Sequence, residues 1–122
     1  MIMGIGVDII ELDRVARSME QERFMTRLLT ERERQLVDTY SPTRRIEFVA
    51  GRFAAKEAYA KAVGTGIAHG LSWQHIEILP DASGRPVMTG PTSGRIHVSI
   101  SHSAHYAVAQ VIIEEGEHHV SS

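Results

Sequence analysis

The chain contains no cysteine, and it has no long apolar run. Disulfide bonds and thiolate metal ligands are therefore excluded, and a reducing cytoplasm is the expected location. A membrane span is not expected, because crossing a bilayer takes roughly 20 consecutive apolar residues. Residues 1–7 lack the positive segment and cleavage site of a signal peptide. The sequence predicts a protein with neither a disulfide framework nor a membrane anchor.

A strong charge of either sign is also absent. The net charge of −2 over 122 residues argues against broad attraction to nucleic acid, although a local basic patch remains possible. The hydrophobic fraction of 43% and the charged fraction of 23% are typical of a globular protein and argue against disorder. We expect one domain over residues 1–113, followed by a polar tail over residues 114–122.

Helical patterns fill the first half of the chain and strand patterns fill the second half. The predicted helices cover residues 12–19, 23–28, 30–40 and 43–62. The predicted strands cover residues 4–9, 74–79, 85–89, 96–101 and 106–113. Thr30 and Glu33 form a capping-box pattern that opens the third helix, and Gly64 is a natural stop for the longest one. This arrangement predicts an α+β domain with an antiparallel sheet and one long helix.

Asp8 is the first residue that could carry chemistry. The sequence Gly-Ile-Gly-Val-Asp over residues 4–8 alternates like a strand and places the Asp8 carboxylate on the same face as two glycines, where nothing crowds it. An acid in an apolar strand is costly to bury without a partner. Two interpretations stay open: a strand-end acid that caps a nearby helix, or a metal ligand or general base.

The predicted long helix carries two further sets of charged residues. Glu57 and Lys61 are four residues apart and share one face. They could form an ordinary surface ion pair, or they could offer a carboxylate to a hard cation and an ammonium to phosphate oxygens. A basic stripe, mostly on another side of the helix, consists of Arg44, Arg45, Arg52 and Lys56, and it is either a solvated face or an anion site.

Two loop motifs are weaker signals. The segment Gly64-Thr65-Gly66 follows a helix, whereas phosphate loops precede one, so a cap and a turn are the simpler interpretation. Ser101, His102 and Ser103 could supply a nucleophile and a base. However, adjacent strand residues point to opposite faces, which favours ordinary polar turn residues.

Taken together, the segments resemble the bacterial holo-acyl-carrier-protein synthase family of phosphopantetheinyl transferases. Their order, their spacing and the total length agree with that family, and the similarity extends over about residues 1–113. The resembling segments are residues 4–11, 52–58, 61–66, 98–103 and 107–111.

The resemblance implies a 4′-phosphopantetheinyl transferase fold and a magnesium-dependent transfer reaction. Asp8 and Glu57 would hold Mg²⁺ together with the pyrophosphate of coenzyme A, and Lys61 would contact the same phosphates. The serine hydroxyl of an apo-acyl carrier protein would attack the phosphate joined to pantetheine and release adenosine 3′,5′-bisphosphate. Glu57 is a candidate for accepting the serine proton or orienting the water that does. The product, holo-acyl carrier protein, supports fatty acid biosynthesis.

The resemblance also implies binding roles and an assembly. Family members are homotrimers with active sites at the subunit junctions. The resemblance places Arg14 at the surface that would dock the acidic carrier protein. Arg17 shares its face of the first helix, so it would dock the carrier as well. The alternative is that these arginines are simply solvated. The further coenzyme A-binding candidates are Arg45, Arg52, Lys56, Gly64 and His102, of which the two arginines and the histidine would contact the nucleotide and its 3′-phosphate.

Two alternatives remain on the residues alone. Asp8, Glu57 and Lys61 would equally suit a metal-dependent phosphohydrolase, which would release free phosphopantetheine. A non-catalytic module could instead bind an anionic partner through Arg14, Arg17 and the basic stripe, and it would need no Mg²⁺.

Overall fold

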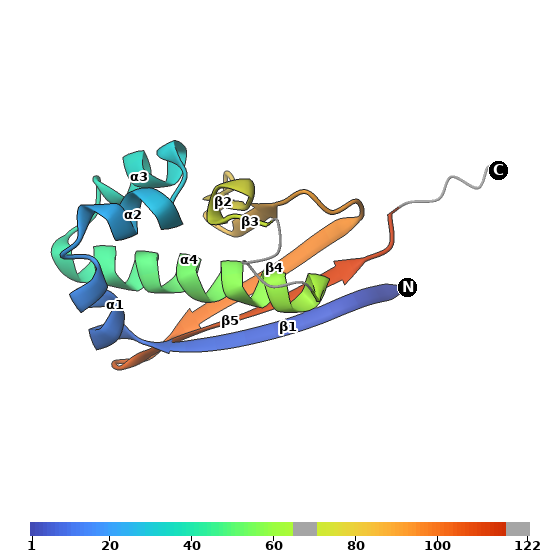
Figure 1. The fold of residues 1–122 in the computed structure, drawn as a ribbon, viewed down its shortest axis with the longest axis horizontal. Helices are drawn as coiled ribbons and strands as arrows, with labels where there is room; N and C mark the ends of the chain where they lie inside the picture. The colour runs from blue at the N-terminus through green and yellow to red at the C-terminus, as the bar shows by residue number, and fades with distance from the viewer. Residues whose placement is uncertain (65–70, 117–122) are drawn as a thin grey trace.

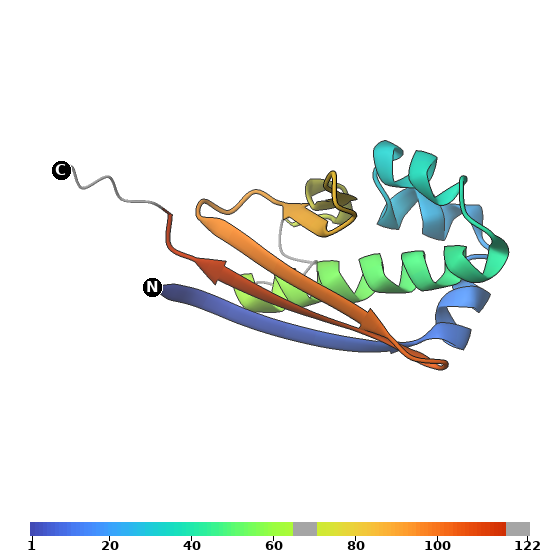
Figure 2. The same cartoon turned by 180° about the vertical axis from the view of Figure 1, so that it is seen from behind.

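A three-stranded antiparallel sheet is the base of the molecule in the computed structural model, which describes residues 1–64 and 71–116. Its strands are β1 (Ile2–Glu11), β4 (Arg95–His102) and β5 (Tyr106–Glu114), in the order β1-β5-β4. Strands β1 and β4 therefore form the two edges (Figures 1 and 2). Asp8 on β1 and Ile100 on β4 both pair with Ala109 on β5, so the three residues form one row across the sheet.

The long helix α4 (Pro42–Val63) packs on the inner face of this sheet (Figure 1). Ser41 caps its first turn, and Gly64 ends it in the left-handed conformation at φ 93°, as the sequence predicts. The helix crosses the sheet diagonally. Gly51, in its first half, lies against the Ile100 side chain of β4, while its second half lies against β1.

Two glycines make the contact between α4 and β1 unusually close. A Cβ added to Gly4 would overlap the carbonyl oxygen of Ala62, and one added to Gly6 would overlap that of Ala58. The prediction that nothing crowds this face of β1 is wrong, because the backbone of α4 fills the space that the glycines leave. Asp8 is the next inward-facing residue along the strand, so it emerges beside the helix.

The remaining elements lie on two sides of α4 (Figure 1). Helix α1 (Leu12–Ser18) follows β1 and lies at the end of the sheet, beside α4. The elements on the side of α4 away from the sheet are α2 (Glu22–Leu28), α3 (Glu31–Val37), the short 3₁₀ helix η1 (Trp73–His75) and the hairpin of β2 (Glu77–Pro80) and β3 (Pro86–Thr89). The predicted capping box of α3 is present. The α+β class, the antiparallel sheet and the single long helix are confirmed.

Two element boundaries differ from the sequence prediction by about three residues, and the others agree with it within two. Helix α3 ends at Val37 and not near residue 40, because the N–H groups of Thr39 and Tyr40 donate to carbonyl oxygens three residues back, which forms turns and no longer the α-helical pattern. Arg45 donates to the carbonyl oxygens of Val37 and Asp38 at this end. The strand expected from residue 74 starts at Glu77, because Ser72 caps a 3₁₀ turn over the preceding residues.

No helix of residues 1–64 and 71–116 covers the outer face of the sheet. Ile5, Val7 and Ile9 project from it with 57%, 54% and 63% of their surfaces exposed. Ile112 and Val108 lie opposite two of them on β5 and extend this apolar stripe. Among the described residues, no helix has the length and apolar character that spanning a membrane requires.

Candidate active site

Asp8 and Lys61 meet where β1 passes under the second half of α4. The Lys61 ammonium donates to Asp8 Oδ1 at 2.9 Å and to the carbonyl oxygen of Val7 at 3.1 Å. The Asp8 side chain is 16% exposed and that of Lys61 is 56% exposed. The carboxylate is therefore fixed in the seam, while the lysine can turn toward a ligand.

Glu57 lies one turn before Lys61 on α4. Its carboxylate interacts electrostatically with the Asp8 carboxylate and with the Lys61 ammonium. Partial burial raises the pKa of Glu57, the Asp8 carboxylate raises it further, and the Lys61 ammonium lowers it. The expected i,i+4 relationship therefore places the side chains of Glu57 and Lys61 near each other, but Lys61 forms its ion pair with Asp8. Two carboxylates and one ammonium converge at a single position.

This donor set fits a magnesium ion. Asp8 and Glu57 repel each other, and a divalent cation between them would relieve that repulsion. Within residues 1–64 and 71–116, no cluster of three or more acidic, histidine or cysteine side chains could hold a metal. Two carboxylates suit Mg²⁺, which keeps several waters and takes its other ligands from substrate phosphates. The structure thus accommodates the predicted metal without testing it.

A second group of candidate residues lines a cavity of about 260 Å³ over the opposite edge of the sheet, which we call the β4 pocket. Arg52 and His102 both line it, together with Arg44 and Glu47. The His102 Nε2 lies 3.7 Å from Glu47 Oε1. Arg44 Nη1 lies 3.8 Å from the same Glu47 oxygen, so the charged lining of the β4 pocket consists of two arginines and one glutamate, with His102 beside them.

Arg52 is held in place on two sides. Its guanidinium carbon lies 3.8 Å from the centre of the Phe48 ring, and the group donates to the carbonyl oxygen of Ile78 at 3.2 Å. Burial lowers the pKa of Arg52 to about 10, so the side chain remains charged at neutral pH. Its Nε is buried and has no hydrogen-bond partner among the residues that the structure describes.

The structure does not bring every predicted residue to these sites. Arg45 lies outside the lining of the β4 pocket and holds the end of α3, whereas the neighbouring Arg44 lines the pocket. Lys56 was predicted to bind coenzyme A, but it is fully buried and ion-paired with Glu33. Burial lowers its pKa, and Glu33 partly offsets that effect. Its three hydrogen bonds are all made inside the protein, so the phosphate-binding assignment of Lys56 is wrong.

Gly64 borders open space at the end of α4. A Cβ added there would meet no atom of the described part of the chain within 4 Å, so these residues leave room for a ligand next to Lys61. The other residues of that predicted loop, Thr65 and Gly66, lie outside the described residues, as do residues 117–122 of the predicted tail.

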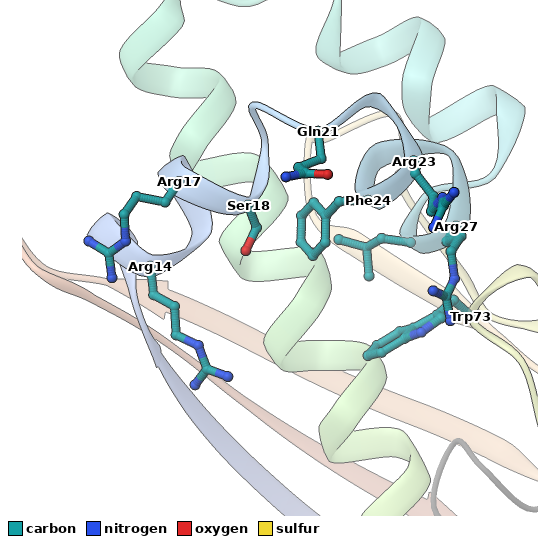
Figure 3. Close-up of a pocket in the computed structure, with 9 residues that line it drawn as sticks. Arg14, Arg17, Ser18, Gln21, Arg23, Phe24, Arg27 and Trp73 are labelled. Carbon is teal, nitrogen blue, oxygen red and sulfur yellow. The ribbon is translucent and has the colours of Figure 1, made fainter.

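Arg14 and Arg17 line a larger cavity of about 580 Å³ between α1, α2 and η1, which we call the arginine-rimmed pocket (Figure 3). Arg23 and Arg27 also line it, and the lining includes the side chains of Phe24, Leu28 and Trp73. A cationic rim around apolar side chains fits an acidic partner that also presents an apolar group. Sequence reasoning missed the aromatic part, because Trp73 is far from α2 along the chain.

Comparisons with known proteins agree with this geometry. A family model described as the 4′-phosphopantetheinyl transferase superfamily matches residues 4–114. A holo-[acyl-carrier-protein] synthase of an Exiguobacterium species is 73% identical over 122 residues and covers 100% of both chains. That of Anoxybacillus flavithermus is 60% identical over 116 residues, which cover 93% of this chain and 97% of the relative.

Solved structures show the same similarity. A crystal structure of a holo-(acyl-carrier-protein) synthase from Bacillus anthracis, in complex with CoA (3′,5′-ADP), is 51% identical, with a TM-score of 0.91 over 95% of this chain and 99% of that chain. The Helicobacter pylori enzyme in complex with coenzyme A is 29% identical, with a TM-score of 0.80 over 90% of this chain and 99% of that chain. The chain therefore belongs to the 4′-phosphopantetheinyl transferase superfamily and, within it, to the holo-[acyl-carrier-protein] synthases.

Proposed function

We propose that this protein transfers the 4′-phosphopantetheine group of coenzyme A to a serine of an apo-acyl carrier protein in the cytoplasm. The products are holo-acyl carrier protein, which supports fatty acid biosynthesis, and adenosine 3′,5′-bisphosphate. The observation that carries the proposal is the convergence of Asp8, Glu57 and Lys61 at the seam between β1 and α4 in a chain of this family.

Asp8 and Glu57 would hold Mg²⁺ at the seam. Bound there, the ion would neutralise the charge that builds on the phosphate oxygens during transfer. The Lys61 side chain is 56% exposed, so its ammonium has space to leave Asp8 and contact the pyrophosphate. These three residues therefore account for both the binding of the reacting phosphates and the stabilisation of their charge.

Glu57 is also the best-placed proton acceptor. In the metal-free chain, partial burial and the Asp8 carboxylate raise the pKa of Glu57, which makes its carboxylate a stronger base than an ordinary glutamate. A Glu57 carboxylate oxygen takes the proton of the serine hydroxyl as the serine oxygen bonds to the phosphorus joined to pantetheine. The bond from that phosphorus to the bridging oxygen breaks, and adenosine 3′,5′-bisphosphate leaves with the electron pair.

The nucleotide end of coenzyme A fits the β4 pocket. Arg44, Arg52 and His102 supply cationic and hydrogen-bonding groups for the 3′-phosphate. However, the β4 pocket and the Asp8 seam lie over opposite edges of the sheet, with α4 packed between them. A site completed by the β4 edge of a neighbouring chain resolves this separation, and the exposed apolar outer face of the sheet supports assembly into a homotrimer.

Intact mass measurement tests the proposed activity. The protein is incubated with coenzyme A, Mg²⁺ and an apo-acyl carrier protein, and we expect the carrier to gain one phosphopantetheine group. An unmodified carrier with free phosphopantetheine in solution would instead identify a phosphohydrolase. An unmodified carrier with intact coenzyme A would identify a binding module.

Replacement of Lys61 tests the phosphate contact. Lys61→Ala is expected to lower kcat/KM for coenzyme A by about 100-fold or more, the usual scale for one charged group on a transferring phosphoryl group. Steady-state kinetics at saturating carrier measure the effect, and Arg85→Ala, which removes an exposed ion pair on the β2–β3 hairpin, serves as the control. A change of less than about twofold would reduce Lys61 to a structural partner of Asp8.

Replacement of Arg14 tests the carrier surface. Arg14→Glu places a negative charge on the arginine-rimmed pocket, so it should raise the KM for an acidic carrier by about tenfold while leaving the KM for coenzyme A nearly unchanged. Added salt should weaken the wild-type activity in the same way, because it screens the attraction. Arg17→Glu is measured beside it, and an unaltered carrier KM in both variants would remove α1 from the interface.

A further inference from the structure

A buried ion pair ties α4 to the elements above it. Lys56 on α4 and Glu33 on α3 are both fully buried, and Lys56 Nζ lies 2.7 Å from Glu33 Oε1. The ammonium also donates to the carbonyl oxygens of Leu28 at 2.7 Å and Trp73 at 3.1 Å. The lysine thus holds the end of α2 and the start of η1 against α4.

The Glu33 carboxylate extends these connections. Besides the lysine, it accepts hydrogen bonds from the backbone N–H groups of Thr30 at 2.9 Å and Ile78 at 2.7 Å. The same Ile78 residue accepts from Arg52 at its carbonyl oxygen. We call Glu33, Lys56 and their backbone partners the Glu33–Lys56 cluster, which joins α2, α3, α4, η1 and β2.

The cluster borders both proposed substrate sites without entering either. Leu28 and Trp73 line the arginine-rimmed pocket, and Lys56 binds their backbones from beneath. Arg52, which Ile78 connects to the cluster, lines the β4 pocket. Lys56 directly precedes Glu57 on α4, so a shift of this turn of the helix would move the proposed base as well.

Stability alone is a poor explanation for such a cluster. Removing two charges from water costs about as much as their attraction returns, and apolar side chains of similar volume often serve equally well. Hydrogen bonds differ from apolar contacts because they fix lengths and directions. A cluster that fixes two backbone carbonyls relative to α4 therefore defines a geometry.

We infer that Glu33 and Lys56 are positioning residues, which set the placement of the docked carrier protein relative to Glu57. The inference rests on the proposed function. Both residues act through the lining of the arginine-rimmed pocket and touch no substrate themselves. Their loss should chiefly lower kcat, because displacing reacting groups by about 1 Å can cost up to roughly 100-fold in rate. The KM for coenzyme A should change much less.

The test is the double variant Glu33→Gln/Lys56→Met, which removes both charges, nearly preserves the side-chain volumes and leaves no unpaired charge. Val49→Ala is the matched control, because Val49 lies two turns earlier on the same side of α4 and is fully buried, but it has no polar partner. At saturating coenzyme A and carrier, we expect kcat to fall at least about tenfold in the double variant. Val49→Ala should keep kcat within about twofold of wild type, even if it lowers the melting temperature as much as the double variant does.

Trp73 gives a second readout that needs no transfer. It is the only tryptophan of the chain, so intrinsic fluorescence reports on the arginine-rimmed pocket directly. The emission of Trp73, and its change when carrier is added, should differ from wild type in the double variant and not in Val49→Ala. If wild type fails to modify the carrier, the proposed function fails, and the emission still decides whether the cluster positions Trp73.

Two outcomes would overturn the inference. One is a double variant with kcat within about twofold of wild type and wild-type Trp73 emission. The other is an equal loss of kcat in Val49→Ala, which would show that any loss of core packing has the same effect. Should the double variant not fold, Glu33→Asp keeps the charge but shortens its reach, and the same two measurements on it decide the question.

Discussion

Asp8→Asn and Glu57→Gln should each lower phosphopantetheine transfer by at least about 100-fold, because each removes one of the two carboxylates proposed to hold Mg²⁺. Both substitutions keep the shape of the side chain, so the fold should persist. Transfer is measured by carrier mass at increasing Mg²⁺ concentrations. Near-normal turnover of either variant at saturating Mg²⁺ would contradict the metal assignment.

Stability gives this prediction an independent control. The pKa of Glu57 is raised in the folded chain, so its ionised form is less favourable there than in the unfolded chain. Without Mg²⁺ at neutral pH, Glu57→Gln should therefore unfold at the same temperature as wild type or a higher one. Any gain should disappear as the pH falls below the ordinary range of a glutamate, where the carboxyl group is protonated in both states. Loss of activity with stability intact would separate a chemical role from a structural one.

Val7→Glu should prevent assembly of the proposed homotrimer. Val7 lies in the middle of the exposed apolar stripe on the outer face of the sheet, and a buried carboxylate without a partner at a subunit interface is costly. We expect monomers by sedimentation analysis and a loss of transfer of about 100-fold, since the Asp8 seam would lack the β4 pocket of a neighbouring chain.

Val87→Glu is the control for this substitution. Val87 is 47% exposed on β3, away from the outer face of the sheet, so the same chemical change there should leave the assembly state unaltered. A Val7→Glu variant that assembles like wild type would place the subunit interface elsewhere. A wild-type protein that is a fully active monomer at micromolar concentration would contradict the split site itself.

Local signals in the sequence predict much of the fold, because the interactions behind them join residues close along the chain. The capping box of Thr30 and Glu33 spans one turn, and the left-handed cap at Gly64 depends on one residue. The alternation over residues 4–8 predicts the strand for the same reason. Each of these is confirmed.

Lys56 illustrates what local signals cannot supply. It shares helical spacing with Arg52, which suggested a basic face open to phosphates. Its actual partners lie on α3, at the end of α2 and on η1, and they are separated from it by 17 to 28 residues along the chain. Nothing within the helix shows that these segments will cover that side of α4.

The candidate site depends partly on local spacing along α4 and partly on a long-range contact. Spacing on the helix placed Glu57 and Lys61 together, but it suggested that they pair with each other. The lysine instead pairs with Asp8, which lies 53 residues away on β1, and only the crossing of α4 over the sheet brings the two together. The family resemblance suggested one site for all three residues, and the fold explains how the chain assembles it.

The glycines of β1 also determine how this protein can be engineered. Because Gly4 and Gly6 let the backbones of β1 and α4 touch, the separation of Asp8 from α4 does not depend on the size of any core side chain. Substitutions that improve packing beneath α1 to α3 can therefore raise thermal stability without altering the spacing of the carboxylates. Gly6→Ala would alter that spacing, because the added methyl group would push α4 away from the sheet. The substitution would do so without removing Asp8, Glu57 or Lys61.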